Sequence, residues 1–184
     1  MPSKPNGQIH IYTGNGKGKS TAGLGLAIRA LGAGLKTGLI YFDKGGDFYN
    51  ERKILDQLKE LHPDKLDYLA FGTQRMQENK AFRFENLAAD LTEAKKALRQ
   101  ATTWFKQDFD LLILDELNTT VKTKLLELDD LLKMLEKKPD HLELILTGRY
   151  CPAEIIDLAD LVTEMTEVKH YIYNGVKVRP GIDY

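Results

Sequence analysis

The sequence has little of what would place it in several common protein classes. Only one of its 184 residues is cysteine (Cys151), so the chain forms no internal disulfide and has no cysteine cluster for a metal ion. No apolar run is long enough to span a membrane, and residues 1–7 lack the apolar stretch of a secretory signal. With 26 basic and 27 acidic residues, the formal net charge is −1. These absences predict a cytoplasmic protein with no membrane or nucleic-acid partner.

The chain length suits one domain with a sizeable core and is too short for two of ordinary size. We expect residues 1–8 to form a short flexible arm and residues 9–184 to form that domain. Along it, apolar runs typical of strands alternate with segments of helical periodicity. Such alternation predicts an α/β fold in which helices flank a mostly parallel sheet.

The expected strands lie at 9–13, 36–42, 66–71, 110–116 and 142–149, with a further short strand from 161. The expected helices lie at 19–33, between 49–52 and 61, and at 79–106, 125–138 and 155–159. Asn174-Gly175 is a dipeptide typical of tight two-residue turns, so we expect a small hairpin in the C-terminal segment.

A glycine-rich turn between the first strand and the first helix predicts a phosphate-binding loop. Its glycines allow a tight turn that points backbone N–H groups inward, and the following helix directs its positive end to the same place. Lys19 would neutralise phosphate charge, and the Ser20 hydroxyl would be a ligand of bound Mg²⁺. The expected nucleotide-binding residues are Gly14, Asn15, Gly16, Lys17, Gly18, Lys19, Ser20 and Thr21.

The loop differs from the common pattern by one position. In G-x-x-x-x-G-K-[ST], counted back from Lys19, the first glycine would stand at Thr13, but it stands at Gly14. The cradle is therefore one residue shorter than the standard one. Two interpretations remain open: an imperfect match, or a loop that holds its nucleotide in an unusual way.

A second signal is the apolar run of residues 111–114, which ends in Asp115-Glu116. Buried parallel strands deliver carboxylates to nucleotide sites in this way, so Asp115 would orient Mg²⁺ and Glu116 would hold a water or a neighbouring group. The alternative is an exposed acidic turn. Arg149 follows another strand and would contact phosphate, unless it forms only a surface salt bridge.

Several blocks of the sequence together resemble the ATP:corrinoid adenosyltransferases. Besides the short loop and Leu114-Asp115-Glu116-Leu117, these blocks are Lys44-Gly45, Asn50-Glu51-Arg52, Thr147-Gly148-Arg149, Asp157-Leu158-Ala159-Asp160, Val168-Lys169-His170 and Gly181-Ile182-Asp183-Tyr184. They occur in order over nearly the whole chain. The short loop and the two C-terminal blocks are the specific part of the resemblance, because generic nucleotide hydrolases share neither.

The resemblance implies a single-domain, RecA-like enzyme with a P-loop that acts as a homodimer. Such an enzyme transfers the 5′-deoxyadenosyl group of ATP to the Co(I) of a reduced corrinoid and releases triphosphate. Its nucleotide lies reversed in the loop, and a flavoprotein is a candidate electron donor. Carried over to this sequence, the catalytic residues are Lys19, Glu116 and Arg149, and the Mg²⁺ ligands are Ser20 and Asp115.

The same resemblance places the corrinoid near Glu51, Arg52 and Phe71. Here the sequence departs from the family, in which a Gly-Phe-Thr-Trp type segment closes aromatic side chains over the corrinoid. The corresponding residues 70–74 contain no tryptophan, which leaves Phe71, Phe82 or Phe84 as substitutes. The N-terminal arm is also shorter than in the family.

Two other functions are compatible with parts of the sequence. Lys19, Ser20 and Asp115-Glu116 alone would suit a conventional P-loop ATPase or small-molecule kinase. The missing tryptophan would suit a nucleotide-gated protein that binds a corrinoid without alkylating it. The products formed from ATP distinguish all three.

Overall fold

The fold is an α/β sandwich built on a sheet of six strands, in the order β3-β2-β4-β5-β1-β6. We describe it from a computed structural model, which describes residues 6–75 and 82–184. All five strand pairs are parallel, so the predicted fold class is confirmed. The strands are β1 (Ile9–Thr13), β2 (Thr37–Tyr41), β3 (Leu66–Ala70), β4 (Leu111–Asp115), β5 (Glu143–Thr147) and β6 (Leu161–Glu164).

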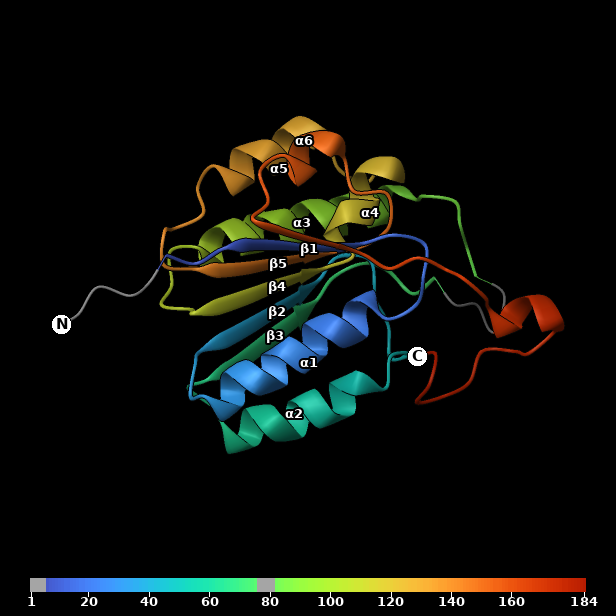
Figure 1. The fold of residues 1–184 in the computed structure, drawn as a ribbon, viewed down its shortest axis with the longest axis horizontal. Helices are drawn as coiled ribbons and strands as arrows, with labels where there is room; N and C mark the ends of the chain where they lie inside the picture. Colours follow the sequence, from blue (N-terminus) through green and yellow to red (C-terminus); the bar gives the residue numbers. More distant parts are fainter. Residues whose placement is uncertain (1–5, 76–81) are drawn as a thin grey trace.

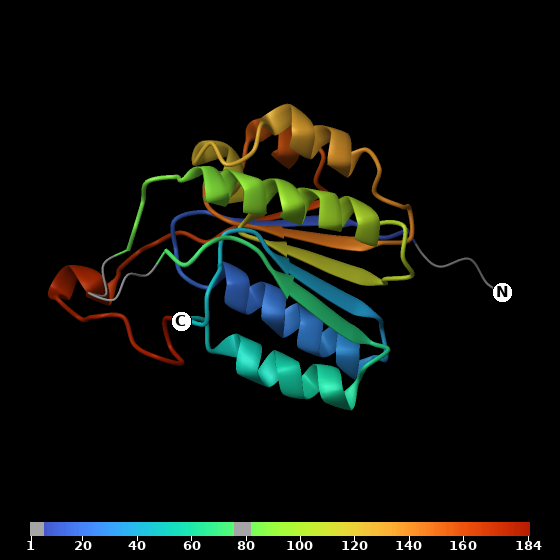
Figure 2. The same ribbon diagram turned by 180° about the vertical axis from the view of Figure 1, so that it is seen from behind.

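Helices cover both faces of the sheet (Figure 1). On one face lie α1 (Lys19–Gly32) and α2 (Glu51–Leu61). On the other lie α3 (Ala88–Trp104), α4 (Leu117–Lys122), α5 (Leu128–Leu135) and α6 (Ala153–Ile156). Figure 2 shows the same two layers from behind. None of the helices in the described ranges has both the length and the apolar character needed to cross a membrane.

The two faces of the sheet have separate cores because successive side chains of a strand point in opposite directions. In β2, Leu39 packs in the core under α1 and α2, whereas Ile40 packs in the larger core under α3 and α5. The central strands β2 and β4 are buried along their whole length, as their continuous apolar runs predict.

The helix predicted at 79–106 begins only at Ala88; its first positions at 79–81 lie outside the described residues. The Asp90 carboxylate fixes this start, because it accepts a 2.7 Å hydrogen bond from the Leu87 backbone N–H. Asp90 also pairs with Arg83 at 2.7 Å and accepts from Thr73. The hydrogen bonds from Arg83 lower the pKa of this carboxyl. Arg83 and Leu87 are therefore held by hydrogen bonds to Asp90, and the helix does not extend toward the N-terminus beyond Ala88.

Two further details differ from the sequence-based expectation. Helix α4 was not predicted, because its sequence Leu-Asn-Thr-Thr-Val-Lys has low helix propensity; burial of Leu117 and Asn118 stabilises it. The predicted hairpin around Asn174-Gly175 is wrong. Tyr171–Asn174 form a 3₁₀ helix, and Gly175 ends it in the left-handed conformation, with φ 78°.

Gly38 offers a test of the packing between β2 and its neighbours. A Cβ atom there would lie 2.4 Å from Leu112 Cδ2 and 2.9 Å from Trp104 Cζ3. Gly38→Ala should therefore lower the free energy of unfolding by about 1–3 kcal/mol, measured by urea denaturation. Gly25→Ala is the control: Gly25 is an exposed position of α1, and beyond its chain neighbours and the helix backbone no atom lies within 4 Å of the added Cβ, so this change should stabilise. Equal effects of the two changes would contradict the packing described.

Candidate active site at the carboxyl edge of the sheet

The phosphate loop links β1 to α1 and lies directly against the end of β6. Gly14 has φ 92°, which a side chain would disfavour. The Gly16 N–H donates a 2.6 Å hydrogen bond to the Met165 carbonyl, and a Cβ on Gly16 would come within 2.7 Å of that oxygen. Because Gly14 and Gly16 have no side chain, the loop can pack closely against the end of the edge strand β6.

Lys19, the first residue of α1, folds back under the loop. Its ammonium donates to the Gly14 carbonyl at 2.8 Å and to the Gly16 carbonyl at 2.6 Å. The side chain is buried, and this burial lowers the pKa of Lys19, with Glu116 opposing the shift. The ammonium thus lies inside the loop; its role in neutralising phosphate stays a prediction.

A second lysine joins three elements of the site. Lys44, in the loop after β2, places its ammonium 2.6 Å from Asp115 Oδ2 at the end of β4. The same ammonium donates to the Ser20 hydroxyl at 2.8 Å. Burial alone would lower the pKa of Lys44, but the charges of Asp115 and Glu116 outweigh it and raise the pKa. The lysine is therefore protonated at neutral pH.

Hydrogen bonds fix the two carboxylates that follow β4. The Thr147 hydroxyl donates to Asp115 Oδ1 at 2.6 Å and accepts from the Glu116 N–H at 3.1 Å. The Thr119 hydroxyl donates to Glu116 Oε2 at 2.7 Å and accepts from the Arg149 N–H at 3.0 Å. Glu116 itself has φ 62°, a conformation that costs on the order of 1–3 kcal/mol. The ends of β4 and β5 are thereby locked together.

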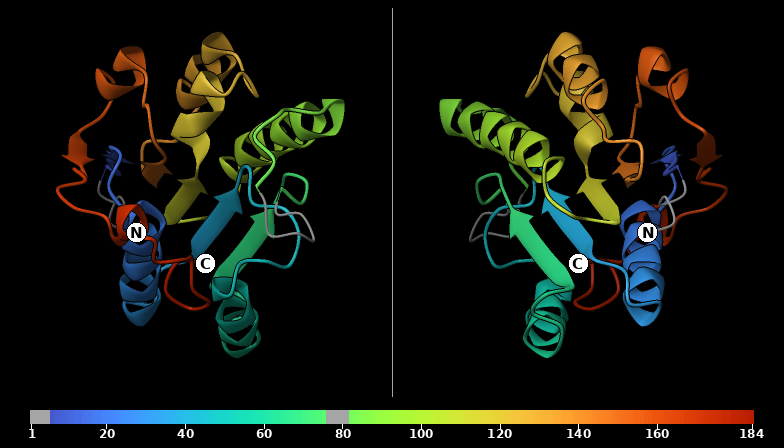
Figure 3. Two further views of the ribbon diagram at one scale, coloured as in Figure 1. Left: turned by 90° about the vertical axis from the view of Figure 1, so that its right-hand side faces the viewer. Right: turned by 90° about the vertical axis from the view of Figure 1, so that its left-hand side faces the viewer.

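These groups surround a cavity of about 650 Å³ at the carboxyl edge. Figure 3 (left) looks onto this edge. Lys19, Glu116 and Arg149, the three residues expected to be catalytic, all line this cavity. Its other walls are loop residues Gly16, Lys17, Gly18, Ser20 and Thr21, together with Lys44, Tyr49, Glu51 and parts of the segment 170–184. Asn15 instead lines a neighbouring hollow of about 410 Å³, which shares Arg149 with the larger cavity.

The C-terminal segment of residues 170–184, here called the tail, covers one side of this cavity and is held by Lys17. The Lys17 ammonium donates to the Tyr171 hydroxyl at 2.9 Å and to the Ile182 carbonyl at 2.6 Å, and it pairs with Asp183. Asp183 also accepts from Tyr171, and Arg179 Nε lies 3.2 Å from its carboxylate. Lys17 therefore contacts the tail rather than pointing into the loop.

Further along, Tyr184 is docked on the loop after β2. Its ring stacks on Phe48 with centroids 3.9 Å apart, and its carbonyl accepts from the Asn50 amide at 3.0 Å. Both contacts lie beside the cavity wall formed by Tyr49 and Glu51. The tail thus joins the phosphate loop at one end to the start of α2 at the other.

The residues expected at the corrinoid do not share one role in the structure. Glu51 lines the cavity at the start of α2. The Arg52 guanidinium donates to the carbonyls of Lys44 and Gly46 and so holds the loop after β2. Phe71 packs against the larger core. Of these three residues, Glu51 alone lines the cavity.

Sequence reasoning did not give Lys44 or Thr119 a chemical role. Lys44 has a recognisable signal, because it follows a buried strand at the edge where parallel sheets bind ligands. Thr119 has none, because its function depends on the short helix α4 and on contacts with Glu116 and Arg149.

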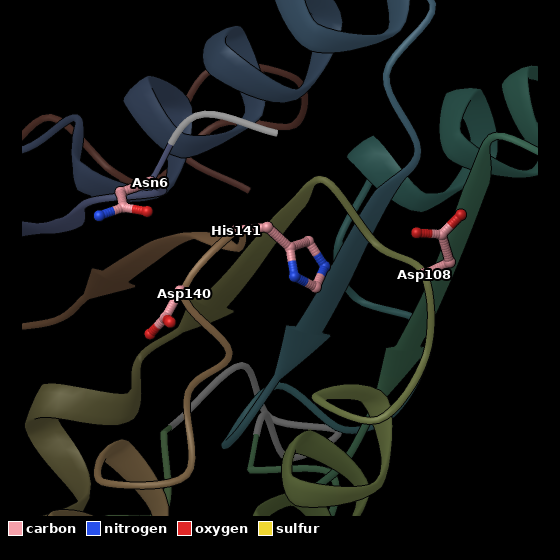
Figure 4. A pocket seen from close by; sticks show the side chains of 4 residues that line it. All are labelled: Asn6, Asp108, Asp140 and His141. Atoms are coloured by element: carbon pink, nitrogen blue, oxygen red, sulfur yellow. The ribbon is translucent and has the colours of Figure 1, made fainter. Parts of the chain in front are cut away.

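The opposite edge of the sheet also has a hollow, of about 420 Å³. Asn6, Asp108, Asp140 and His141 line it, from segments that precede β1, β4 and β5 (Figure 4). Their side chains do not converge on one point in that view. The convergent polar groups are at the carboxyl edge, which is therefore the candidate active site.

The docking of the tail on Lys17 leads to a prediction for Asp183→Asn. Losing the carboxylate charge removes its pairing with Lys17 and Arg179, so amide hydrogen exchange in residues 171–184 should become several-fold faster. Lys177→Met, at an exposed position of the same segment, is the control. Folding lowers the pKa of Asp183, chiefly through Lys17. Its contribution is therefore complete above about pH 4 and is lost only as the pH falls further. Unchanged exchange in Asp183→Asn would contradict the docking.

Comparison with known proteins indicates which family the chain resembles. The sequence profile of the family described as ATP:corrinoid adenosyltransferase BtuR/CobO/CobP matches residues 5–184. A corrinoid adenosyltransferase of Salmonella typhimurium is 36% identical over 178 residues, which are 97% of this chain and 86% of that protein. The Escherichia coli K12 corrinoid adenosyltransferase gives the same identity and coverage. The Pseudomonas aeruginosa one is 32% identical over 97% of this chain and 84% of its own length.

Among solved structures, the flagellar accessory protein FlaH of Methanocaldococcus jannaschii is similar, with a TM-score of 0.56. The match covers 87% of this chain and 71% of that one, at 14% sequence identity, so it bears on the fold alone. From the profile, the relatives and the short loop together, the chain belongs to the ATP:corrinoid adenosyltransferase family.

Proposed function

We propose that the protein transfers the 5′-deoxyadenosyl group of ATP to the cobalt of a reduced corrinoid and releases triphosphate. The observation that carries this proposal is the 650 Å³ cavity at the carboxyl edge, which joins the short phosphate loop to Lys44, Glu116 and Arg149. Family membership supports the choice of substrates, since the similar proteins are named corrinoid adenosyltransferases.

The transfer of the 5′-deoxyadenosyl group to Co(I) requires few catalytic groups from the protein. Co(I) is the nucleophile: its electron pair forms the bond to the ribose C5′, the C5′–O bond breaks, and triphosphate leaves with the electrons of that bond. No side-chain nucleophile is needed, and burial raises the pKa of the Cys151 thiol to about 12, which keeps it protonated. The protein positions the reactants and stabilises the charge of the leaving group.

Lys19, the loop N–H groups and Arg149 are the groups that would bind the triphosphate. Lys19 approaches from inside the loop, and Arg149 lies at the exposed border of the cavity. Glu116 is negatively charged and would not bind phosphate, so we assign it to holding Thr119 and, with it, the backbone of Arg149. It is a positioning residue in this scheme.

Ser20 and Asp115 fit a divalent cation. Both side-chain oxygens lie within 2.8 Å of one ammonium, that of Lys44, so they can reach a common cation. Oxygen ligands of this kind, completed by phosphate and water, are those Mg²⁺ prefers. When bound, Mg²⁺ would neutralise phosphate charge.

For the corrinoid, we propose that Phe82 and Phe84 replace the family's aromatic segment. Their rings lie 5.0 Å apart, and 86% of the Phe84 side chain is exposed. The Arg75 guanidinium, which pairs with Asp43, donates to the backbone carbonyls of Arg83 and Glu85 on either side of Phe84 and so fixes the chain there. Phe71, packed against the core, is less available.

Two partners and a location complete the proposal. Co(I) must be generated by an electron donor, for which the family resemblance suggests a flavoprotein, and the same resemblance suggests a homodimer. A cytoplasmic location suits both the reduced cobalt and the free thiol of Cys151.

Product analysis tests the proposed reaction. Incubation with ATP, Mg²⁺ and chemically reduced cobalamin should change the corrin spectrum and release triphosphate in equal amount to the alkylated cobalt. ADP and phosphate would instead indicate the ATPase or kinase that Ser20 and Asp115-Glu116 alone would suit. Tight corrinoid binding without a cobalt–carbon bond would indicate a corrinoid-binding protein.

Lys19→Ala should abolish triphosphate release, with a loss of about 100-fold or more in kcat/KM, because the cation inside the loop is removed. Lys133→Ala, on the exposed side of α5, removes the same charge and should behave as wild type. Circular dichroism would show that both variants are folded. Full activity of Lys19→Ala would mean that the loop does not bind the polyphosphate.

Phe84→Ala tests the proposed corrinoid surface. Removing this exposed ring should raise the KM for the corrinoid about tenfold and leave the Kd for ATP unchanged. The matched control is Leu61→Ala, an exposed apolar residue at the far end of α2. If both variants keep the wild-type KM, the corrinoid binds elsewhere.

A further inference from the structure

Lys44 occupies an unusual position for a lysine on a surface loop. Its ammonium lies between a hydroxyl of the phosphate-loop helix, Ser20, and a carboxylate of the central strand β4, Asp115. Only 11% of the Lys44 side chain and 2% of the Asp115 side chain are exposed. The Lys44 ammonium thus lies between the Ser20 hydroxyl and the Asp115 carboxylate. P-loop proteins hold their metal ion between a hydroxyl and a carboxylate of this kind.

The backbone around Lys44 is fixed, so this placement is not a chance rotamer of a mobile loop. The Lys44 N–H donates to the Phe71 carbonyl at 3.1 Å, and Arg52 binds the Lys44 carbonyl. The next residue, Gly45, lies so close to Gly72 that a Cβ would come within 2.1 Å of the Gly72 carbonyl oxygen. The position of the Lys44 backbone is therefore fixed, and its side chain extends toward Ser20 and Asp115.

Two tyrosine rings lie close to the Lys44 ammonium and help to hold it in the cavity. The ammonium lies 5.5 Å from the ring centroid of Tyr41 and 5.3 Å from that of Tyr49, distances at which a cation is attracted to a ring face. Tyr49 and Lys44 both line the cavity that contains Lys19. Two lysines from different elements therefore face the same space, one from inside the loop and one from across it.

We propose that Lys44 is a tethered cation for the triphosphate chain of ATP, which lets the protein bind ATP without a divalent metal. A metal ion that binds Ser20 and Asp115 must displace this ammonium, which then moves to a phosphate oxygen. The proposal rests on the proposed function for the identity of the nucleotide, and it assigns to Lys44 a contact with substrate.

The test measures ATP binding by calorimetry, in EDTA and in Mg²⁺, independently of turnover. In EDTA, Lys44→Met should raise the Kd for ATP at least about tenfold, the size of a lost charged hydrogen bond. In Mg²⁺ the rise should be under about threefold, because the metal takes over the neutralisation. Lys59→Met is the matched control: Lys59 pairs with Asp67 at 2.6 Å, and its side chain is 45% exposed. It should leave both Kd values at those of wild type.

A double variant separates contact with phosphate from mere neutralisation of Asp115. Lys44→Met leaves a buried carboxylate unpaired, which can lower stability and repel ATP. Lys44→Met with Asp115→Asn removes both charges, and thermal denaturation would establish that it is folded. If Lys44 contacts phosphate, ATP binding in EDTA stays at least about tenfold weaker in the double variant.

Recovery of the wild-type Kd in EDTA by the double variant would overturn the proposal, since Lys44 would then serve only to neutralise Asp115. An unchanged Kd in Lys44→Met would overturn it as well. Neither result depends on the products of the reaction. Failure of this proposal is therefore distinguishable from failure to form triphosphate and alkylated cobalt.

Discussion

The buried ion pair between Lys44 and Asp115 is the interaction on which the site depends. It joins the loop after β2 to the end of β4, and through Ser20 it reaches the start of α1. Breaking a buried pair by removing one partner costs on the order of 3–5 kcal/mol, because the remaining charge stays out of water. The central carboxyl edge of the sheet is thus held by charge, while its two faces are held by apolar packing. The side chains to which we assign substrate and metal binding also stabilise the fold here.

The rest of the site is arranged around that pair by contacts between distant parts of the chain. On one side, Thr147 and Thr119 fix the two carboxylates that follow β4 and the backbone of Arg149. On the other, the tail spans from Lys17 to Phe48. These residues lie at the end of a strand or in the segment that follows it, on β1, β2, β4 and β5. The parallel strands therefore determine where the residues meet, as is general for open α/β sheets.

The sequence was sufficient for the features that follow from local pattern. Continuous apolar runs predicted β2, β4 and β5, and the glycine-rich turn predicted the loop between β1 and α1 that precedes Lys19 and Ser20. It was insufficient where partners are far apart in the chain. The role of Lys17 depends on Asp183, 166 residues away, and the start of α3 depends on a buried carboxylate that binds Arg83. Periodicity carries no information about either contact, and the Asn-Gly signal in the tail was overridden by the docking of Tyr171.

The closeness of the phosphate loop to Met165 has a consequence for how the protein is made. The loop is synthesised before the Met165 carbonyl that fixes Gly16 and before both strands that flank β1, which are β5 and β6. Residues 9–20 therefore cannot reach their final form on the ribosome until β5 and β6 have emerged. Contacts of such long range form late and slow folding. Nucleotide binding would thus report that the whole sheet is complete, and ATP would selectively stabilise fully folded chains.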